Sequence, residues 1–190
     1  EIVLKDQVIE LGGMTINPEM NALNVFTDIN LKTNPVNSSQ EVLQKVPGLI
    51  IGQHAGGGKA EQLFLRGFDI DHGTDINITV DGLPVNMVSH AHGQGYADLH
   101  WLIPETIDNI DFGKGPYNAA ACNVATAGSV GFNTKDRLKH STVQMQYGSF
   151  NSSRFLTMLN VLNDERHSAD IAADYQLTDG PFDSSQNFRR

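Results

Sequence analysis

The chain has 190 residues, 39% of them hydrophobic, so it is long enough to bury a core of its own. Its formal net charge of −9 lacks the basic surface expected of a nucleic-acid-binding protein, and we expect no nucleic-acid partner. The sequence contains no run of about 18 apolar residues, which excludes a membrane-spanning helix. A single cysteine, Cys122, excludes an intramolecular disulfide.

The N-terminal segment, residues 1–36, is predicted to be extended and then irregular. Residues 1–9 are rich in valine, isoleucine and leucine, whereas glycines and prolines follow them. We expect an edge strand and then a loop.

A short helix is predicted next. Ser38 and Glu41 have the spacing of a capping box, in which the serine hydroxyl accepts a hydrogen bond from the amide three residues later. Pro47–Gly48 ends the helix. The apolar run Leu49–Ile51 predicts a buried strand, and residues 62–66 predict another after a glycine-rich loop.

The middle of the chain mixes strands with short helices. Ile76–Val80 alternates apolar and polar residues, which predicts a half-buried strand, and Asp81–Gly82 is typical of the tight turn that follows. Pro104 is predicted to open a second short helix that extends to Asn109, because proline suits a first helical position. Further strands are expected near residues 110–112 and 129–133. This mixture predicts an α+β fold rather than a βαβ repeat.

Beyond residue 136 the apolar residues recur with a period of two. The segments near residues 141–147 and 169–177 alternate between an apolar and a polar face, and residues 155–162 between them are nearly all apolar apart from Thr157 and Asn160. Strands of about ten residues with this pattern are typical of a transmembrane barrel with a lipid-facing outside and a wet lumen. A soluble β-sandwich is the alternative.

Six motifs resemble the plug of TonB-dependent outer-membrane receptors, in the same order and at similar spacing. They are Glu41–Leu49, Leu65–Phe68, Val80–Pro84, Ile103–Ile110, Lys114–Tyr117 and Ala127–Asn133. The resemblance divides the chain into an N-terminal extended segment (1–36), a plug domain (37–136) and the first strands of a truncated outer-membrane β-barrel (137–190). Ala119–Asn123 departs from the family because it lacks the usual tyrosine-glycine pair.

This resemblance implies both a fold and a role. The fold is α+β, with a small mixed β-sheet and short helices, followed by a few antiparallel barrel strands. Such a plug fills the lumen of a 22-stranded barrel in the outer membrane of a Gram-negative bacterium, whereas this fragment alone is expected to be soluble. The plug gates uptake of a scarce ligand, which is a siderophore, a metal complex or another nutrient.

The resemblance also implies partners. They are the TonB protein of the inner-membrane energy system, the extracellular ligand and the remaining β-barrel of the same receptor. No enzyme activity and no cofactor are expected. The family's TonB box is short and extended, so Lys5, Asp6, Gln7, Val8 and Ile9 are a candidate box, with a plug edge strand as the alternative.

Several residues receive structural roles from the matching motifs. Arg66 and Lys114 are expected to pair with acidic residues of plug and barrel and so latch the plug, and Glu105 is a candidate partner within the chain; ordinary solvated charges are the alternative. The turn residues are expected to serve backbone geometry, through positive φ or close packing, and Asp81 is expected to cap its own turn. These turn residues are Gly67, Asp81, Gly82, Pro84, Gly115, Pro116 and Gly128.

His90 and His92 form an H-x-H pair in a loop that faces outward in the family. Two imidazoles at this spacing can bind a transition metal, so His90 and His92 are candidates for contact with the ligand or a metal, and satisfied or merely exposed histidines are the more common alternative. A soluble metal-dependent hydrolase that uses the histidines and Asp98 is a competing function. A signalling receptor that uses the plug without import is another.

Overall fold

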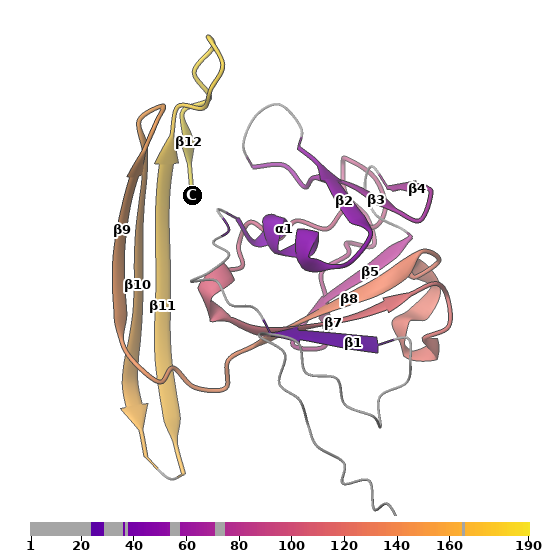
Figure 1. Cartoon of the computed structure of the whole chain (residues 1–190), viewed down its shortest axis with the longest axis horizontal. Coiled ribbons are helices and arrows are strands. Elements are labelled where there is room, and N and C mark those ends of the chain that lie inside the picture. The colour runs from indigo at the N-terminus through magenta and orange to yellow at the C-terminus, as the bar shows by residue number, and fades with distance from the viewer. Residues whose placement is uncertain (1–23, 29–35, 37, 54–57, 71–74, 165) are drawn as a thin grey trace, which may run out of the picture.

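A computed structural model of the chain describes residues 24–28, 36, 38–53, 58–70, 75–164 and 166–190. Figure 1 shows an α+β unit, residues 24–134, beside a separate sheet of long strands, the C-terminal sheet. Residues 135–141 connect the two. The candidate box, Lys5 to Ile9, lies outside the described residues.

The larger sheet of the α+β unit has five strands. Their order is β1 (Asn24–Asp28), β7 (Ile107–Lys114), β8 (Gly128–Thr134), β5 (Ile76–Val80) and β6 (Leu83–Pro84). Strands β5 and β8 run parallel and the other neighbours are antiparallel, so the sheet is mixed, as expected. The alternation in β5 buries its three apolar residues and leaves the two polar ones half-buried, which confirms the predicted strand.

A smaller antiparallel sheet packs on the same core. It contains β2 (Leu49–Gly52), β3 (Gln62–Leu65) and β4 (Phe68–Ile70). The α+β fold is confirmed, with its strands divided between two sheets. Strand β2 is not buried throughout as predicted, because Ile50 points outward and is 66% exposed.

The predicted first helix is present and short. It comprises α1 (Ser39–Val42) and the 3-10 turn η1 (Leu43–Lys45), and the Ser38 hydroxyl accepts a hydrogen bond from the Glu41 amide at 3.2 Å. A third 3-10 segment, η3 (Ala119–Val124), follows the Lys114 turn.

The second predicted helix is wrong in extent. Only η2 (Pro104–Thr106) is helical, and Ile107 already belongs to β7. The register of β7 against β8 shifts between Ile107 and Asn109, so Ile107 and Ile110 both point into the core. This irregularity places buried residues three apart, and that spacing imitates a helix in the sequence.

One apolar core joins the two sheets to α1 and η1. Its buried members come from almost every element of the α+β unit, and several side chains are almost inaccessible to solvent. They are Val42, Leu43, Val46, Leu49, Leu63, Leu65, Ile70, Ile76, Ile78, Val80, Leu99, Leu102, Ile107, Ile110, Phe112, Ala127, Val130 and Phe132.

The C-terminal sheet is antiparallel, in the order β12 (Phe188–Arg189), β11 (Ser168–Thr178), β10 (Ser152–Asn163) and β9 (Thr142–Gly148). The predicted period of two gives it an outer face of exposed apolar side chains and a more polar inner face that carries Arg154 and Asp174. The exposed outer side chains include Val143, Met145, Tyr147, Phe155, Leu159, Ile171 and Tyr175. Within the described part of the chain, no helix is long and apolar enough to cross a membrane.

Candidate functional site

An ion network joins the α+β unit to the C-terminal sheet. The guanidinium of Arg154 donates two hydrogen bonds to the Glu105 carboxylate, from Nη1 to Oε1 and from Nη2 to Oε2, each 2.7 Å long. It donates two more to Asp174, each 3.0 Å long. Planar, bidentate geometry of this kind makes the strongest charge-assisted pairs in proteins.

The sheet register brings Arg154 and Asp174 together. Arg154 in β10 lies opposite Gln176 in β11, so Asp174 is its diagonal neighbour on the inner face. Both side chains are buried, with 5% and 3% of their surface exposed, and Asp174 also pairs with Arg190. Two acidic and two basic groups therefore neutralise one another at a buried position.

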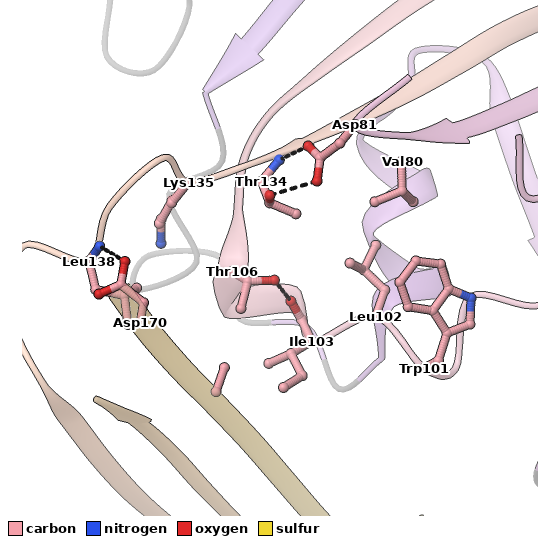
Figure 2. Close-up of a pocket in the computed structure, with 11 residues that line it drawn as sticks. Val80, Asp81, Trp101, Leu102, Ile103, Thr106, Thr134, Lys135, Leu138 and Asp170 are labelled. Carbon is pink, nitrogen blue, oxygen red and sulfur yellow. Dashed lines mark hydrogen bonds between the residues drawn. The ribbon is translucent and has the colours of Figure 1, made fainter. Parts of the chain in front are cut away.

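A cleft of about 340 Å³ lies between the α+β unit and the C-terminal sheet (Figure 2). Trp101 and Ile103 line it from the α+β unit, and Asp170 and Ala172 line it from β11. In the connection between the two bodies, the backbone N–H of Leu138 donates to Asp170 Oδ2 at 3.0 Å. The cleft is thus a seam between two docked surfaces.

Asp81 lines the same cleft and ties two strands together. Its Oδ1 accepts a hydrogen bond from the Thr134 backbone N–H and its Oδ2 accepts one from the Thr134 hydroxyl, both 2.7 Å long (Figure 2). The expectation that Asp81 caps its own turn is therefore corrected. The carboxylate caps the end of β8, because the parallel pairing of β5 and β8 ends both strands at the same edge.

The predicted partner of Glu105 is also corrected. Its carboxylate binds Arg154 rather than Arg66 or Lys114. The reason is position: Glu105 lies in η2, which faces the C-terminal sheet, whereas Lys114 lies at the far end of β7. The latch role of Arg66 and Lys114 towards other carboxylates stays a prediction.

The structure does bring Arg66 close to the Lys114 turn. A side-chain carbon at Gly115 would lie 3.6 Å from Arg66 Nη1, so the guanidinium lies beside that turn. The ammonium of Lys114 lies 5.8 Å from the centre of the Phe112 ring. Two cations are thus presented at one edge of the α+β unit.

The turn residues occupy the backbone conformations that their motifs imply. Arg66 and Gly67 form the two-residue turn between β3 and β4, with φ of 54° and 84°, and Asp81 and Gly82 form the turn between β5 and β6, with φ of 49° and 78°. Gly115 also has positive φ, and Pro84 and Pro116 lie in or beside these turns. Gly128 serves close packing instead.

His90 and His92 stack on Tyr96 rather than converging on one point. The His90 and Tyr96 ring centres are 4.2 Å apart and nearly parallel, and His90 Nδ1 accepts the His92 backbone N–H at 3.1 Å. Among the described residues, no group of three or more His, Cys, Asp or Glu side chains could hold a metal ion. The hydrolase alternative therefore gains no support.

Asp98, the other residue of the hydrolase alternative, is hydrogen-bonded to His100. Its Oδ1 lies 2.7 Å from His100 Nδ1 and accepts the His100 backbone N–H at 2.8 Å. Burial raises the pKa of Asp98, but hydrogen bonds from His100 and Gln40 outweigh it and hold the pKa below its ordinary value.

Arg154 and Asp174 were missed in the sequence as site residues. Arg154 is a charged residue at the start of an almost apolar strand, and a buried charge requires a partner. That signal was present, but its partner lies 49 residues away in the chain.

Comparison with known proteins identifies a family over most of the α+β unit. A model of the family described as TonB-dependent Receptor Plug Domain matches residues 19–129. This span exceeds half of the chain.

Solved structures share the fold at low sequence identity. The pyoverdine outer-membrane receptor FpvA of Pseudomonas aeruginosa, bound to pyoverdine, matches with a TM-score of 0.59 at 19% identity, over 83% of this chain and 22% of its own. The ferric-catecholate import receptor Fiu of Escherichia coli matches with a TM-score of 0.56 at 18% identity, over 82% of this chain and 21% of its own. The copper transporter OprC matches with a TM-score of 0.58 at 18% identity, over 82% of this chain and 24% of its own. The chain thus spans about a fifth to a quarter of the solved proteins that it matches.

Proposed function

The chain belongs to the family of TonB-dependent receptor plug domains, and from that premise we propose that it gates energy-coupled uptake through an outer-membrane receptor. The observation that carries the proposal is the docking of the plug on a sheet with two unlike faces. The inner face bears the ion network with Glu105, and the outer face exposes apolar side chains. A lumen wall between plug and lipid requires this arrangement.

Strands β9 to β12 are, on this proposal, the first strands of the barrel. Val143, Met145, Phe155 and Ile171 then face lipid, and the remaining strands of the receptor continue the sheet from its edges. A sheet with an exposed apolar face and unpaired edges favours association with further strands. This supports residence in the outer membrane of a Gram-negative bacterium.

We assign the ligand to the siderophore or metal-complex class. The solved receptors that share the fold bind pyoverdine, import ferric catecholates or transport copper. The plug itself offers a pocket of about 700 Å³ around the Asp81 turn, and His90, Tyr96 and Trp101 are among its lining residues. The stacked rings of His90 and Tyr96 present flat, polarisable surface to a ligand there.

Energy coupling is assigned to the N-terminal segment, with Lys5 to Ile9 as the TonB box. Ligand binding increases the exposure of the box only if the ligand binds more tightly to the receptor conformation in which the box is exposed. Arg66 and Lys114, which lie at one edge of the plug, are proposed to latch it to acidic residues of the barrel. Neutralising both in the full receptor should loosen the plug and sensitise cells to large antibiotics.

Uptake by whole cells tests the proposal. The full receptor is expressed in a Gram-negative strain without its own siderophore receptors, and cells receive radiolabelled ferripyoverdine, ferric enterobactin or copper ions. Accumulation of one of these that requires TonB is the expected result. A variant lacking residues 1–11 should accumulate none and should not be retained by the immobilised TonB C-terminal domain.

Two outcomes would count against parts of this function. Equal uptake with and without TonB would refute energy coupling. Failure of all three probes, with the receptor present in the membrane by immunoblot, would refute the assigned ligand class.

A further inference from the structure

We propose that Glu105 and Arg154 form a fixed anchor that stays closed while the rest of the plug moves. The inference rests on the proposed function, because it concerns the plug during uptake. It differs from the latch formed by Arg66 and Lys114 in polarity, since here the plug supplies the carboxylate and the wall supplies the cation. It also lies at the other end of β7.

The first reason is the chemistry of the contact. All four hydrogen bonds of the Arg154 side chain go to Glu105 and Asp174, and the side chain is 5% exposed. Withdrawal of Glu105 would leave two of these donors without their carboxylate at a buried position. Removing one partner of a buried, hydrogen-bonded charge pair is strongly unfavourable, so this contact resists opening.

The second reason is that other attachments converge at the same place. The Lys135 ammonium donates to the Glu105 carbonyl oxygen at 2.6 Å, and the Lys135 backbone N–H donates to the Thr106 carbonyl at 2.9 Å. The chain then passes directly into the C-terminal sheet. Movement at η2 would therefore have to break the ion pair and strain the covalent connection together.

A small apolar cluster reinforces this attachment. Leu138 from the connection and Leu156 and Met158 from β10 are buried together, and Ile103 of the plug packs against them. Leu156 and Met158 follow Arg154 on the same face of β10. Ionic, apolar and covalent contacts thus coincide within one short stretch of wall.

A neighbouring contact, on β12 two residues from Arg190, is of a weaker kind. There the His100 ring meets the edge of the Phe188 ring, with 6.3 Å between centres. An edge contact between two rings can slide or separate without leaving a charge unpaired. Force applied through the N-terminal segment should therefore separate the loop at His100 from β12 and leave η2 in place.

Reversible cross-linking in the full receptor tests the anchor. Cys122 is first replaced by alanine, and cysteines replace Glu105 and Arg154 in one receptor. Arg190 remains to neutralise Asp174 in that receptor. A short bifunctional thiol reagent, cleavable by reductant, joins the two cysteines, and uptake is measured with the three probes named above.

A second pair provides the matched control. Cysteines at His100 and Phe188 are joined by the same reagent, at the contact that should open. The anchor cross-link should leave uptake unchanged, whereas the control cross-link should abolish uptake until reductant is added. Loss of uptake from the anchor cross-link, reversed by reductant, overturns the proposal, and so does unchanged uptake with both.

Cross-linking yield gives a measurement that needs no transport. In cells, the yield between positions 105 and 154 should be equal with and without a protonophore that collapses the inner-membrane proton gradient, because the Lys135 hydrogen bonds and the apolar cluster around Leu138 still hold η2 in the cysteine receptor. A lower yield in energised cells would overturn the anchor. Absence of uptake before any cross-linking, with receptor present by immunoblot, would instead count against the proposed function.

A double-mutant cycle addresses the risk that the cysteine receptor folds poorly. Replacing Glu105 by glutamine or Arg154 by methionine alone should lower the melting temperature of the full receptor, and the two together should lower it by less than the sum of the two single losses. A shortfall of this kind requires a direct contact between the two residues. Additive losses would show that the pair does not hold plug and wall together.

Discussion

Gly128 should be intolerant of any side chain, because of the close approach of two strands. A Cβ at this position would lie 2.4 Å from the carbonyl oxygen of Gly113 in β7, whereas real Cβ contacts essentially never fall below 3.0 Å. The obstacle is backbone held in a hydrogen-bonded ladder, so it cannot rotate away. Strands β7 and β8 would have to separate next to the Lys114 turn.

The magnitude follows from two opposing terms. Overpacking of a rigid site typically destabilises a protein by about 1–3 kcal/mol, and a backbone obstacle belongs at the upper end. Loss of glycine freedom in the unfolded chain offsets about 0.4–1 kcal/mol. We expect Gly128→Ala to reduce the free energy of unfolding by about 2 kcal/mol, which lowers the melting temperature of a chain this long by roughly 4–8 °C.

Thermal unfolding followed by circular dichroism measures this change. Gly131→Ala in the same strand is the control, because its Cβ would meet the Thr79 hydroxyl at 3.2 Å, a side-chain atom with room to adjust. Its effect should stay below about 1 kcal/mol. Equal losses for the two variants, or no loss for Gly128→Ala, would refute the reasoning.

Three further predictions concern other contacts in the plug. Asp81→Asn should lower the unfolding free energy by about 1 kcal/mol, since it weakens two charge-assisted bonds to Thr134, and chemical denaturation measures it. Asp98 has a pKa below its ordinary 3.8, so its charged form stabilises the fold above that pH, and this stability is lost as pH falls through the lowered pKa. The difference in unfolding free energy between the wild type and Asp98→Asn should therefore shrink below about pH 4. Replacing His100 by alanine should remove most of that difference. Ser38→Ala should lower the unfolding free energy by about 1 kcal/mol through loss of the N-cap, and restoration by Ser38→Thr is the check.

Local patterns were sufficient to predict most individual elements. The capping serine Ser38, the alternation in Ile76–Val80 and the Asp81–Gly82 turn each act over a few residues, where backbone sterics and side-chain period decide the outcome. The same is true of the two unlike faces of β10 and β11. The helix expected over residues 104–109 was wrong because a strand irregularity reproduced a helical spacing.

The site was predicted less completely than the fold. Glu105 was identified as an ion-pair partner, but its cation was sought among Arg66 and Lys114 and is Arg154. Asp81 was identified as a turn residue, but its carboxylate serves Thr134. In both cases the residue was recognised and the partner was not, because the partner belongs to another strand.

By itself, the sequence determined most of the element types, the turns, the family and the two faces of the C-terminal strands. These follow from interactions between residues close together in the chain, or from ordered motifs. Only the tertiary structure decided that η2 docks on the C-terminal sheet at Arg154 and that the Asp81 carboxylate binds the end of β8 at Thr134, across separations of 49 and 53 residues. The physical reason is that such pairs depend on how three sheets pack and register, and no local spacing encodes that arrangement.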